Sequence, residues 1–188
     1  ETVQWNINSE QTSEMRRFLD GVMVPAGKEN LFPIGVMIEN LVTVRPQAGL
    51  QKASVVYEAL AEGGITRFLA VYSSDVVLDE IGPVRSARPY FVDWAKEYGA
   101  LYVYVGGSPQ ALSALRDDAT SGVVNLDQMT ASPYFWRKKE FAAPHNLFTS
   151  SKLLVFALHD RDLLEKPGIF APWKFIIPLK KEERPTEE

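Results

Sequence analysis

Between residues 45 and 110, short apolar runs alternate with four phrases that combine glycine or proline with arginine or a hydroxyl group. This pattern limits the chain to short buried elements joined by tight turns. The phrases occupy residues 45–47, 62–67, 82–88 and 106–109. Because loops carry reactive groups that a rigid scaffold aims, the pattern predicts a site for an anion at the edge of the scaffold.

Length and composition allow one domain with a substantial core. The chain has 188 residues, of which 46% are hydrophobic, and its formal net charge is −4. That length and apolar content suffice for a single buried core. An acidic chain has no general basic field that would attract nucleic acid, so we expect no nucleic-acid partner and only a local convergence of arginines.

Several kinds of site are excluded or disfavoured by residue counts. The chain has no cysteine, which excludes disulfides, thiolate metal ligands and a cysteine nucleophile. Its only histidines are His145 and His159, so we predict no metal site and no cofactor. No run of 18 apolar residues and no signal-peptide core is present in the sequence given.

The apolar runs predict a mixed β-sheet. Residues 32–38 form a compact apolar run typical of a buried strand. Residues 53–60 and 66–72 flank Gly63-Gly64 and predict an antiparallel hairpin. The alternative for residues 53–61 is a helix, because alanine, leucine and glutamate favour helices.

Two β-α units follow the hairpin. We predict a helix over 86–98 capped by Ser86 and ended by Gly99, and a second helix from Ser108, with Pro109 in its first turn, to about Arg116. Further segments are strands at 101–105, 123–126 and 173–179 and a helix at 152–158 capped by Ser150 or Ser151. The fold class is therefore α/β (or α+β), a mixed sheet with a hairpin and β-α units and with helices packed on the sheet.

The domain organisation follows from the composition of the ends. We expect residues 1–30 to form an N-terminal arm and residues 31–179 to form a single α/β domain. Residues 180–188 are charged and contain no apolar side chain, which predicts a linker toward a further C-terminal domain.

The arginines are the leading candidates for ligand binding. Arg85 and Arg88 lie three residues apart at the start of a predicted helix, where they would share a face and oppose the helix dipole. A bound anion between two guanidinium groups would explain this placement. The alternative is a structural ion pair with one of the carboxylates Glu58, Glu62 and Asp93.

The remaining predicted ligand-binding residues lie on the neighbouring phrases. In the hairpin, Arg67 is expected opposite Glu58 and Glu62, and Arg45 lies in the loop before it. The start of the second helix offers a hydroxyl and free backbone N–H groups, which bind anions in many folds. The full predicted binding set is Arg45, Arg67, Arg85, Ser86, Arg88, Gly106, Gly107 and Ser108.

Catalysis has fewer candidates. Glu58 and Glu62 are the carboxyl groups that could act as acid or base, and His145 is the histidine that could assist. The aromatic triplet 134–136 could line a groove for a sugar or peptide, although such side chains are mostly core. No Gly-x-Ser-x-Gly motif supports serine catalysis.

The order of the phrases resembles the YerB-like family of bacterial lipoproteins. The resemblance runs through residues 45–50, 56–58, 62–69, 81–88, 106–109 and 145–147. It implies an exported domain of unknown function, held at the membrane only through a lipid on a cysteine near the mature N-terminus and followed by a smaller C-terminal domain.

Three function hypotheses remain open. The leading one is a non-enzymatic, extracytoplasmic domain of the cell envelope that binds an anionic envelope ligand or an envelope protein through the arginine cluster. The first alternative is a hydrolase or transferase acting on an envelope polymer. The second is a structural network of ion pairs that holds the loops together.

Overall fold

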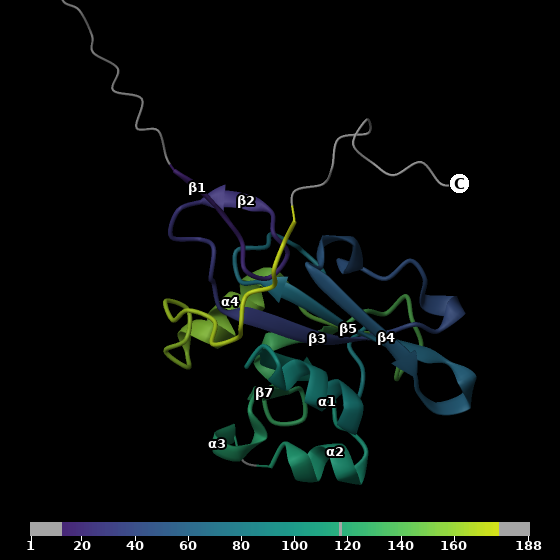
Figure 1. The fold of residues 1–188 in the computed structure, drawn as a ribbon. Helices are drawn as coiled ribbons and strands as arrows, with labels where there is room; N and C mark the ends of the chain where they lie inside the picture. The colour runs from purple at the N-terminus through teal and green to yellow at the C-terminus, as the bar shows by residue number, and fades with distance from the viewer. Residues whose placement is uncertain (1–12, 117, 177–188) are drawn as a thin grey trace, which may run out of the picture.

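A five-stranded mixed sheet forms the centre of the computed structural model, which describes residues 13–116 and 118–176. Its strands run in the order β4-β5-β3-β6-β7 (Figure 1). Their bounds are β3 Pro33–Glu39, β4 Val55–Leu60, β5 Thr66–Ser73, β6 Leu101–Tyr104 and β7 Val124–Asp127. The predicted fold class is thereby confirmed.

One half of the sheet is antiparallel. β4 and β5 form the predicted hairpin around the short 3-10 turn Glu62–Gly64, and β5 also pairs with β3. Side chains of β4 alternate between half-buried and exposed, the period of a strand with one covered face. The helix alternative for residues 53–61 is therefore wrong, because packing against the sheet overrides the local preference of alanine and leucine.

The other half is parallel. β6 pairs parallel with both β3 and β7. Helix α1 (Pro89–Lys96) precedes β6, and helices α2 (Pro109–Ala114) and α3 (Asp118–Ser121) connect β6 to β7. Ser108 caps α2 and Pro109 occupies its first turn, as predicted, because the N–H that proline lacks has no partner at that position.

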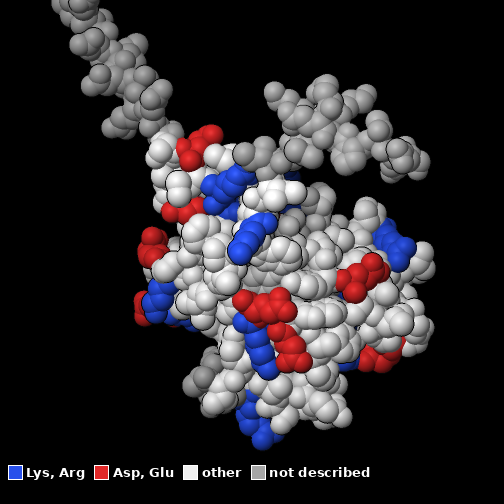
Figure 2. Space-filling model, viewed as in Figure 1, with Lys and Arg blue, Asp and Glu red and all other residues white. Residues whose placement is uncertain are grey.

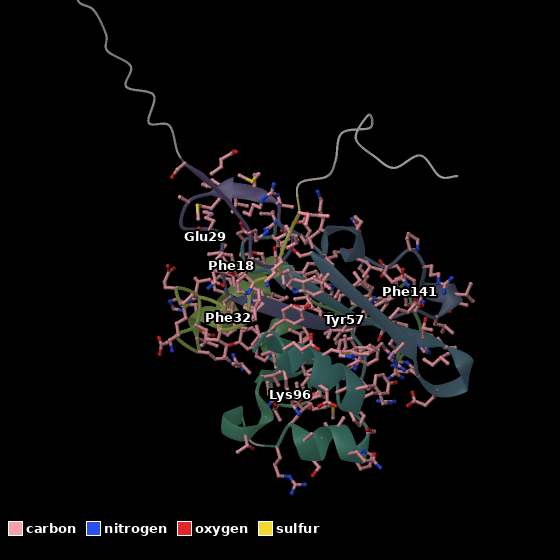
Figure 3. All side chains as sticks on the ribbon, viewed as in Figure 1. Phe18, Glu29, Phe32, Tyr57, Lys96 and Phe141 are labelled. Carbon is pink, nitrogen blue, oxygen red and sulfur yellow. The ribbon has the colours of Figure 1, made fainter. Side chains whose placement is uncertain are left out.

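Helices cover both faces of the sheet (Figure 1). On one face, Phe91 and Val92 of α1 pack against Met37, Leu69 and Tyr102. Tyr57 of β4, labelled in Figure 3, stacks on Trp94 of the same helix with ring centroids 5.0 Å apart. On the other face, α4 (Ser151–His159) packs Leu154 and Leu158 over side chains of β3 and β6. Every residue of β3 is buried, since the strand is covered from both sides.

A segment outside the named strands fills the gap where β3 and β6 separate. The pairing of β3 with β6 ends at Val36 and Val103. Beyond that point, Arg85 donates its backbone N–H to Met37 O at 3.0 Å, and Val105 donates to Arg85 O at 3.2 Å. Residues 81–88, named here the inserted segment, thus bridge the carboxyl ends of both strands.

The inserted segment also bonds to two loops on its other side. Ala48 and Gly82 exchange backbone hydrogen bonds of 2.9 and 3.1 Å, and Val84 donates to Leu147 O at 2.7 Å. Leu147 belongs to β9 (Leu147–Phe148), which pairs with β8 (Trp136–Arg137). Loops 45–50 and 138–147 are therefore anchored to the same segment.

The described part of the predicted N-terminal arm is a small hairpin. Strands β1 (Glu14–Arg16) and β2 (Met23–Pro25) pair antiparallel, and residues 1–12 lie outside the described residues. Trp173 donates its backbone N–H to Phe18 O at 3.3 Å, so the end of the described chain passes this hairpin (Figure 1).

Of the described residues, no helix combines the length and apolarity needed to cross a membrane. The predicted linker 180–188 lies outside the described residues.

Two predicted elements were wrong. Helix α1 begins at Pro89 with Arg88 at its N-cap, so Ser86 is not the cap and Arg85 does not share a helix face with Arg88. The reason is that Ala87 pairs with Gly107, which keeps the preceding residues extended, and a residue before proline avoids helical geometry. The strand expected at 173–179 is absent from residues 173–176, which pair with no ladder, and residues 177–179 are not described.

Replacing Gly82 with alanine should strongly destabilise the fold. Gly82 has φ +149°, and an added Cβ would lie 2.9 Å from Leu147 O and 3.1 Å from Val84 N. Both contacts are to backbone, so we expect a loss of about 3 kcal/mol or more in the free energy of unfolding, measured by denaturant titration.

Gly63→Ala is the matched control. Gly63 also has a positive φ, +67°, but an added Cβ would meet no atom within 4 Å. Backbone strain alone should then cost about 1–2 kcal/mol. Equal losses of unfolding free energy in Gly82→Ala and Gly63→Ala would show that the close contact of Gly82 with the backbone of Leu147 and Val84 does not matter for stability.

Candidate functional site

A small hollow of about 180 Å³ lies at the carboxyl end of β3 and beside the β4–β5 turn. It is lined by polar and apolar side chains from the end of β3, the hairpin turn, the inserted segment and loop 138–147. The lining residues are Glu39, Leu41, Ala61, Glu62, Ile65, Arg67, Arg85 and His145. Four segments distant in sequence therefore meet at one place.

Glu39 is the deepest charged group of the hollow. It ends β3, and the strand register places it directly opposite Arg67 of β5. Only 4% of its side chain is exposed, and its Oε2 lies 2.5 Å from Arg85 Nε and 2.7 Å from His145 Nδ1. A buried carboxylate requires such partners, because desolvation of an unpaired charge costs several kcal/mol.

The two contacts of Glu39 differ in kind. The Arg85 Nε group approaches Oε2 closely but not in hydrogen-bond geometry, so this contact is an ion pair. The His145 contact is a hydrogen bond whose donor depends on the tautomer. If Nδ1 carries the proton, Glu39 fixes the tautomer that leaves Nε2 as an acceptor. Within residues 13–116 and 118–176, no partner of His145 Nε2 is found.

Glu62 bridges two arginines at the rim of the hollow. Arg67 Nη2 donates to Glu62 Oε2 at 2.8 Å, and Arg88 Nε donates to Glu62 Oε1. The arginine side chains are 7% and 15% exposed, whereas the Glu62 side chain is 61% exposed. Each carboxylate oxygen thus binds a different, largely buried guanidinium group.

Electrostatic shifts reflect this arrangement. The hydrogen bond from Arg88 is the largest cause that lowers the pKa of Glu62 from its usual 4.5 to about 2; burial opposes it, and the positive charges of Arg67 and Arg88 add to the lowering. Burial lowers the pKa of Arg67, and the nearby charge of Arg88 adds to this, while Glu62 and Glu39 oppose it. The positive charges of Arg67 and Arg88 therefore act on each other at the rim of the hollow, where the Glu62 carboxylate lies between them.

A second polar network lies next to the hollow and holds the predicted residues Arg45 and Glu58. Arg45 Nε donates to Asn40 Oδ1 at 2.9 Å, and Asn40 Nδ2 donates to Glu58 Oε1 at 3.1 Å. Thr66 Oγ1 also donates to Glu58 Oε1, at 2.6 Å. Glu58 lies across from Phe68, not from Arg67 as expected, because the register pairs Arg67 with Ala59. Neither Arg45 nor Glu58 lines the hollow.

Residues 106–108 form backbone hydrogen bonds with the inserted segment. Gly106 donates its N–H to Asp127 Oδ1 at 2.9 Å, and Ser108 donates its N–H to Ala87 O at 3.3 Å. Ser108 Oγ accepts from Ala111 N–H as the cap of α2. Gly107 lies so close to Ala87 that a Cβ would be 3.2 Å from Ala87 O. None of Gly106, Gly107 and Ser108 lines the hollow, and their binding of an anion stays a prediction.

Of the predicted binding residues, the structure brings three arginines and Ser86 together. Arg67 and Arg85 line the hollow, Arg88 reaches it through Glu62, and Ser86 contributes its backbone carbonyl, which accepts from Arg67 Nη1 at 3.1 Å. Of the predicted catalytic candidates, Glu62 and His145 line it.

Glu39 is the site residue that the sequence analysis missed. The signal was available, because an acidic residue directly follows an uninterrupted apolar run and therefore ends a buried strand. Asn40, the next residue, was missed in the same way and connects Arg45 to Glu58.

The face seen in Figure 2 has no large region of positive charge that would attract an anion from a distance. On the face seen in Figure 2, acidic and basic side chains are interspersed, and no large region carries one sign. Among the described residues, no three His, Asp or Glu side chains gather as a metal site would require.

The fold and the hollow define an α/β domain whose central strand ends in a compact arginine–glutamate–histidine cluster. Residues 19–163 match the family model described as "Protein of unknown function (DUF3048) N-terminal domain". This match covers more than half of the chain, and the chain belongs to this family.

Two comparisons with individual proteins agree with the YerB-like resemblance. The chain is 43% identical over 118 residues to a Bacillus subtilis (strain 168) protein named "Putative lipoprotein YerB". The matched region covers 63% of this chain and 35% of that protein. The crystal structure of YerB from Bacillus subtilis superposes with a TM-score of 0.74 at 32% identity, covering 84% of this chain and 53% of that chain. The chain thus spans about a third of the full relative and half of the solved one.

Replacing Arg88 with alanine should raise the pKa of Glu62. Because the folded-state pKa is below 4.5, the pair stabilises the fold above pH 4.5, and this stabilisation is lost as the pH falls toward 2. The exposed position of Glu62 limits the effect to less than about 1 kcal/mol. An NMR titration of the Glu62 carboxyl should show the midpoint moving from about 2 toward 4.5 in Arg88→Ala.

The control is Arg85→Ala, because Arg85 pairs with Glu39 and not with Glu62. Its Glu62 midpoint should stay near that of the wild type. If the Glu62 midpoint moved in Arg85→Ala and not in Arg88→Ala, the pairing of Glu62 with Arg88 would be wrong.

Proposed function

We propose that this domain belongs to an extracytoplasmic lipoprotein of the cell envelope and binds an anionic ligand, or an anionic group of a partner protein, in the arginine-lined hollow. The location is supported by the name of the Bacillus subtilis relative, which describes a lipoprotein. Attachment to the membrane would then depend on a lipid anchor and not on the domain itself.

The convergence of three arginines supports ligand binding. Arg67, Arg85 and Arg88 come from a strand, the inserted segment and a helix N-cap, and all three engage the two carboxylates of the hollow. Three guanidinium groups against two carboxylates leave an excess of positive charge before His145 is considered. Guanidinium groups bind carboxylate and phosphate through paired hydrogen bonds, which suits them to such a ligand.

The structural alternative explains only part of this arrangement. Ion pairs do hold the loops, because Arg85–Glu39 and Arg67–Glu62 connect separate segments. However, buried ion pairs contribute little net stability compared with apolar packing. A purely structural role also gives no reason for an open hollow beside the arginines or for a bridging carboxylate that is mostly exposed.

The double variant Arg85→Ala/Arg88→Ala should lose anion binding. Inorganic phosphate should stabilise the wild-type domain in thermal unfolding, with an increase in Tm that grows with phosphate concentration. The variant lacks two of the three cations and should show no such increase at equal ionic strength.

The matched control is Arg116→Ala/Lys152→Ala, which removes two exposed cations outside the hollow. This control should keep the phosphate response. A response that is equal in the wild type and in Arg85→Ala/Arg88→Ala would contradict binding at the hollow.

A second candidate function is acid–base catalysis on an anionic substrate, and the His145–Glu39 pair favours it. A carboxylate that holds one imidazole nitrogen leaves the other to exchange a proton with substrate or water. His145 lines the hollow, where Arg67 and Arg85 could hold a phosphodiester of an envelope polymer. This version of the hydrolase hypothesis uses Glu39, not Glu58.

Under this second candidate, His145→Gln should lower kcat for a chromogenic phosphodiester by about 100-fold or more. KM and the phosphate Kd should change little, because the arginines hold the substrate. His159→Gln, at the exposed end of α4, is the control and should be without effect. Absence of hydrolysis by the wild type, or full activity in His145→Gln, would refute the catalytic candidate and leave the binding proposal standing.

A further inference from the structure

We propose that Arg67 and Arg88 form a phosphate-binding subsite that Glu62 occupies in the free protein and leaves when the ligand binds. This inference rests on the proposed anion binding and adds the chemical class of the ligand and the way in which binding is controlled. Glu62 would act as an internal competitor whose carboxylate takes the place of two phosphate oxygens.

The two arginines are held in place without Glu62. Arg67 Nη1 donates to Ser86 O at 3.1 Å, and Arg88 Nη1 donates to Ala87 O at 2.6 Å. Both acceptors are backbone carbonyls of the inserted segment, which is fixed by hydrogen bonds to β3 and to residues 105–108 that follow β6. The guanidinium groups therefore keep their positions if the carboxylate departs, and such preorganisation favours ligand binding.

Glu62, by contrast, lies on a turn that is open to solvent. Gly63 and Gly64 follow it with φ of +67° and +72°, and a Cβ added at either would meet no atom within 4 Å. The hydrogen bond from Ala61 N–H to Ile65 O, at 2.8 Å, closes the base of the turn. The side chain, which is 61% exposed, can rotate into solvent without breaking this base.

The charge of the vacated subsite fits a phosphate dianion. With Glu62 displaced, Arg67, Arg85 and Arg88 face one remaining carboxylate, that of Glu39. Three positive charges against one negative charge leave two to be neutralised. A phosphate monoester carries close to two negative charges at neutral pH and has three acceptor oxygens. A carboxylate ligand would carry only one.

Glu39 does not leave in the same way. Its side chain, at the end of β3, is 4% exposed, forms an ion pair with Arg85 and is hydrogen-bonded to His145. The two glutamates of the hollow thus have different roles: Glu39 is fixed and positions cations, whereas Glu62 is exchangeable. Because the pKa of Glu62 is lowered to about 2, the carboxyl stays ionised at physiological pH, and protonation does not release it from the arginines there.

Calorimetric titration with inorganic phosphate at pH 7.5 and constant ionic strength tests the proposal. Removing the competitor in Glu62→Gln should tighten phosphate binding by about two- to fivefold, which corresponds to the loss of an exposed ion pair. Glu62→Ala should do the same. Acetate, a monoanion, should bind more weakly than phosphate to every variant.

Glu58→Gln is the matched control, because Glu58 lies on the same hairpin and bonds to Asn40 and Thr66 rather than to an arginine. Its phosphate Kd should equal that of the wild type. A similar tightening in Glu58→Gln would show that the effect is only a change in net charge.

The outcomes separate this inference from the proposed function. If phosphate binds through Arg85 and Arg88 but Glu62→Gln and Glu62→Ala bind no tighter than the wild type, Glu62 is not a competitor and the inference is refuted alone. Weaker binding in both variants would make Glu62 part of the binding contact, which also refutes it. If phosphate binds to neither the wild type nor the Glu62 variants, the proposed anion binding fails as well.

Discussion

The inserted segment, residues 81–88, is the constraint on which the rest of the molecule depends. β3 and β6 separate after Val36 and Val103, and this segment satisfies the backbone groups that their separation would leave unpaired. On its other side it bonds to Ala48 and Leu147, so it also fixes two loops. Buried backbone groups without partners are costly. Closing the sheet and assembling the hollow are therefore the same structural event.

The site inherits its geometry from that segment. Arg85 reaches Glu39 because the segment runs antiparallel to the end of β3, and Arg88 reaches Glu62 because the segment bends into α1 beside the hairpin turn. Two carboxylates in different environments then share three cations. One is buried and ends a strand, and the other is exposed on a glycine turn. This asymmetry is the observation behind our proposal that Glu39 positions the cations and that Glu62 gives way to a ligand.

Much of the fold was predictable from local pattern. The buried strand β3, the β4–β5 hairpin, the strand β6 and the capped helix α2 follow from apolar runs and from glycine, serine and proline at their ends. The first helix was placed three residues too early, because pairing of Ala87 with Gly107 outweighs the capping preference of Ser86. The predicted strand at the end of the chain failed in residues 173–176, where Trp173 makes one backbone hydrogen bond to Phe18 and no ladder forms. Both errors concern backbone pairing between distant segments, which a local sequence pattern does not report.

The sequence by itself determined which segments are buried, where the turns lie, that no cysteine chemistry is possible, and to which family the phrases belong. Only the tertiary structure decided how the charges pair. Glu39 lies 106 positions before His145, and the residues meet only because the inserted segment bonds both to β3 and to β9. Arg45 and Glu58 were candidates from the sequence, but in the structure they belong to the neighbouring hydrogen-bond network around Asn40 and Thr66. Ion pairing depends on separations of a few ångströms, and separations between distant segments are fixed by the assembled sheet and not by any local preference.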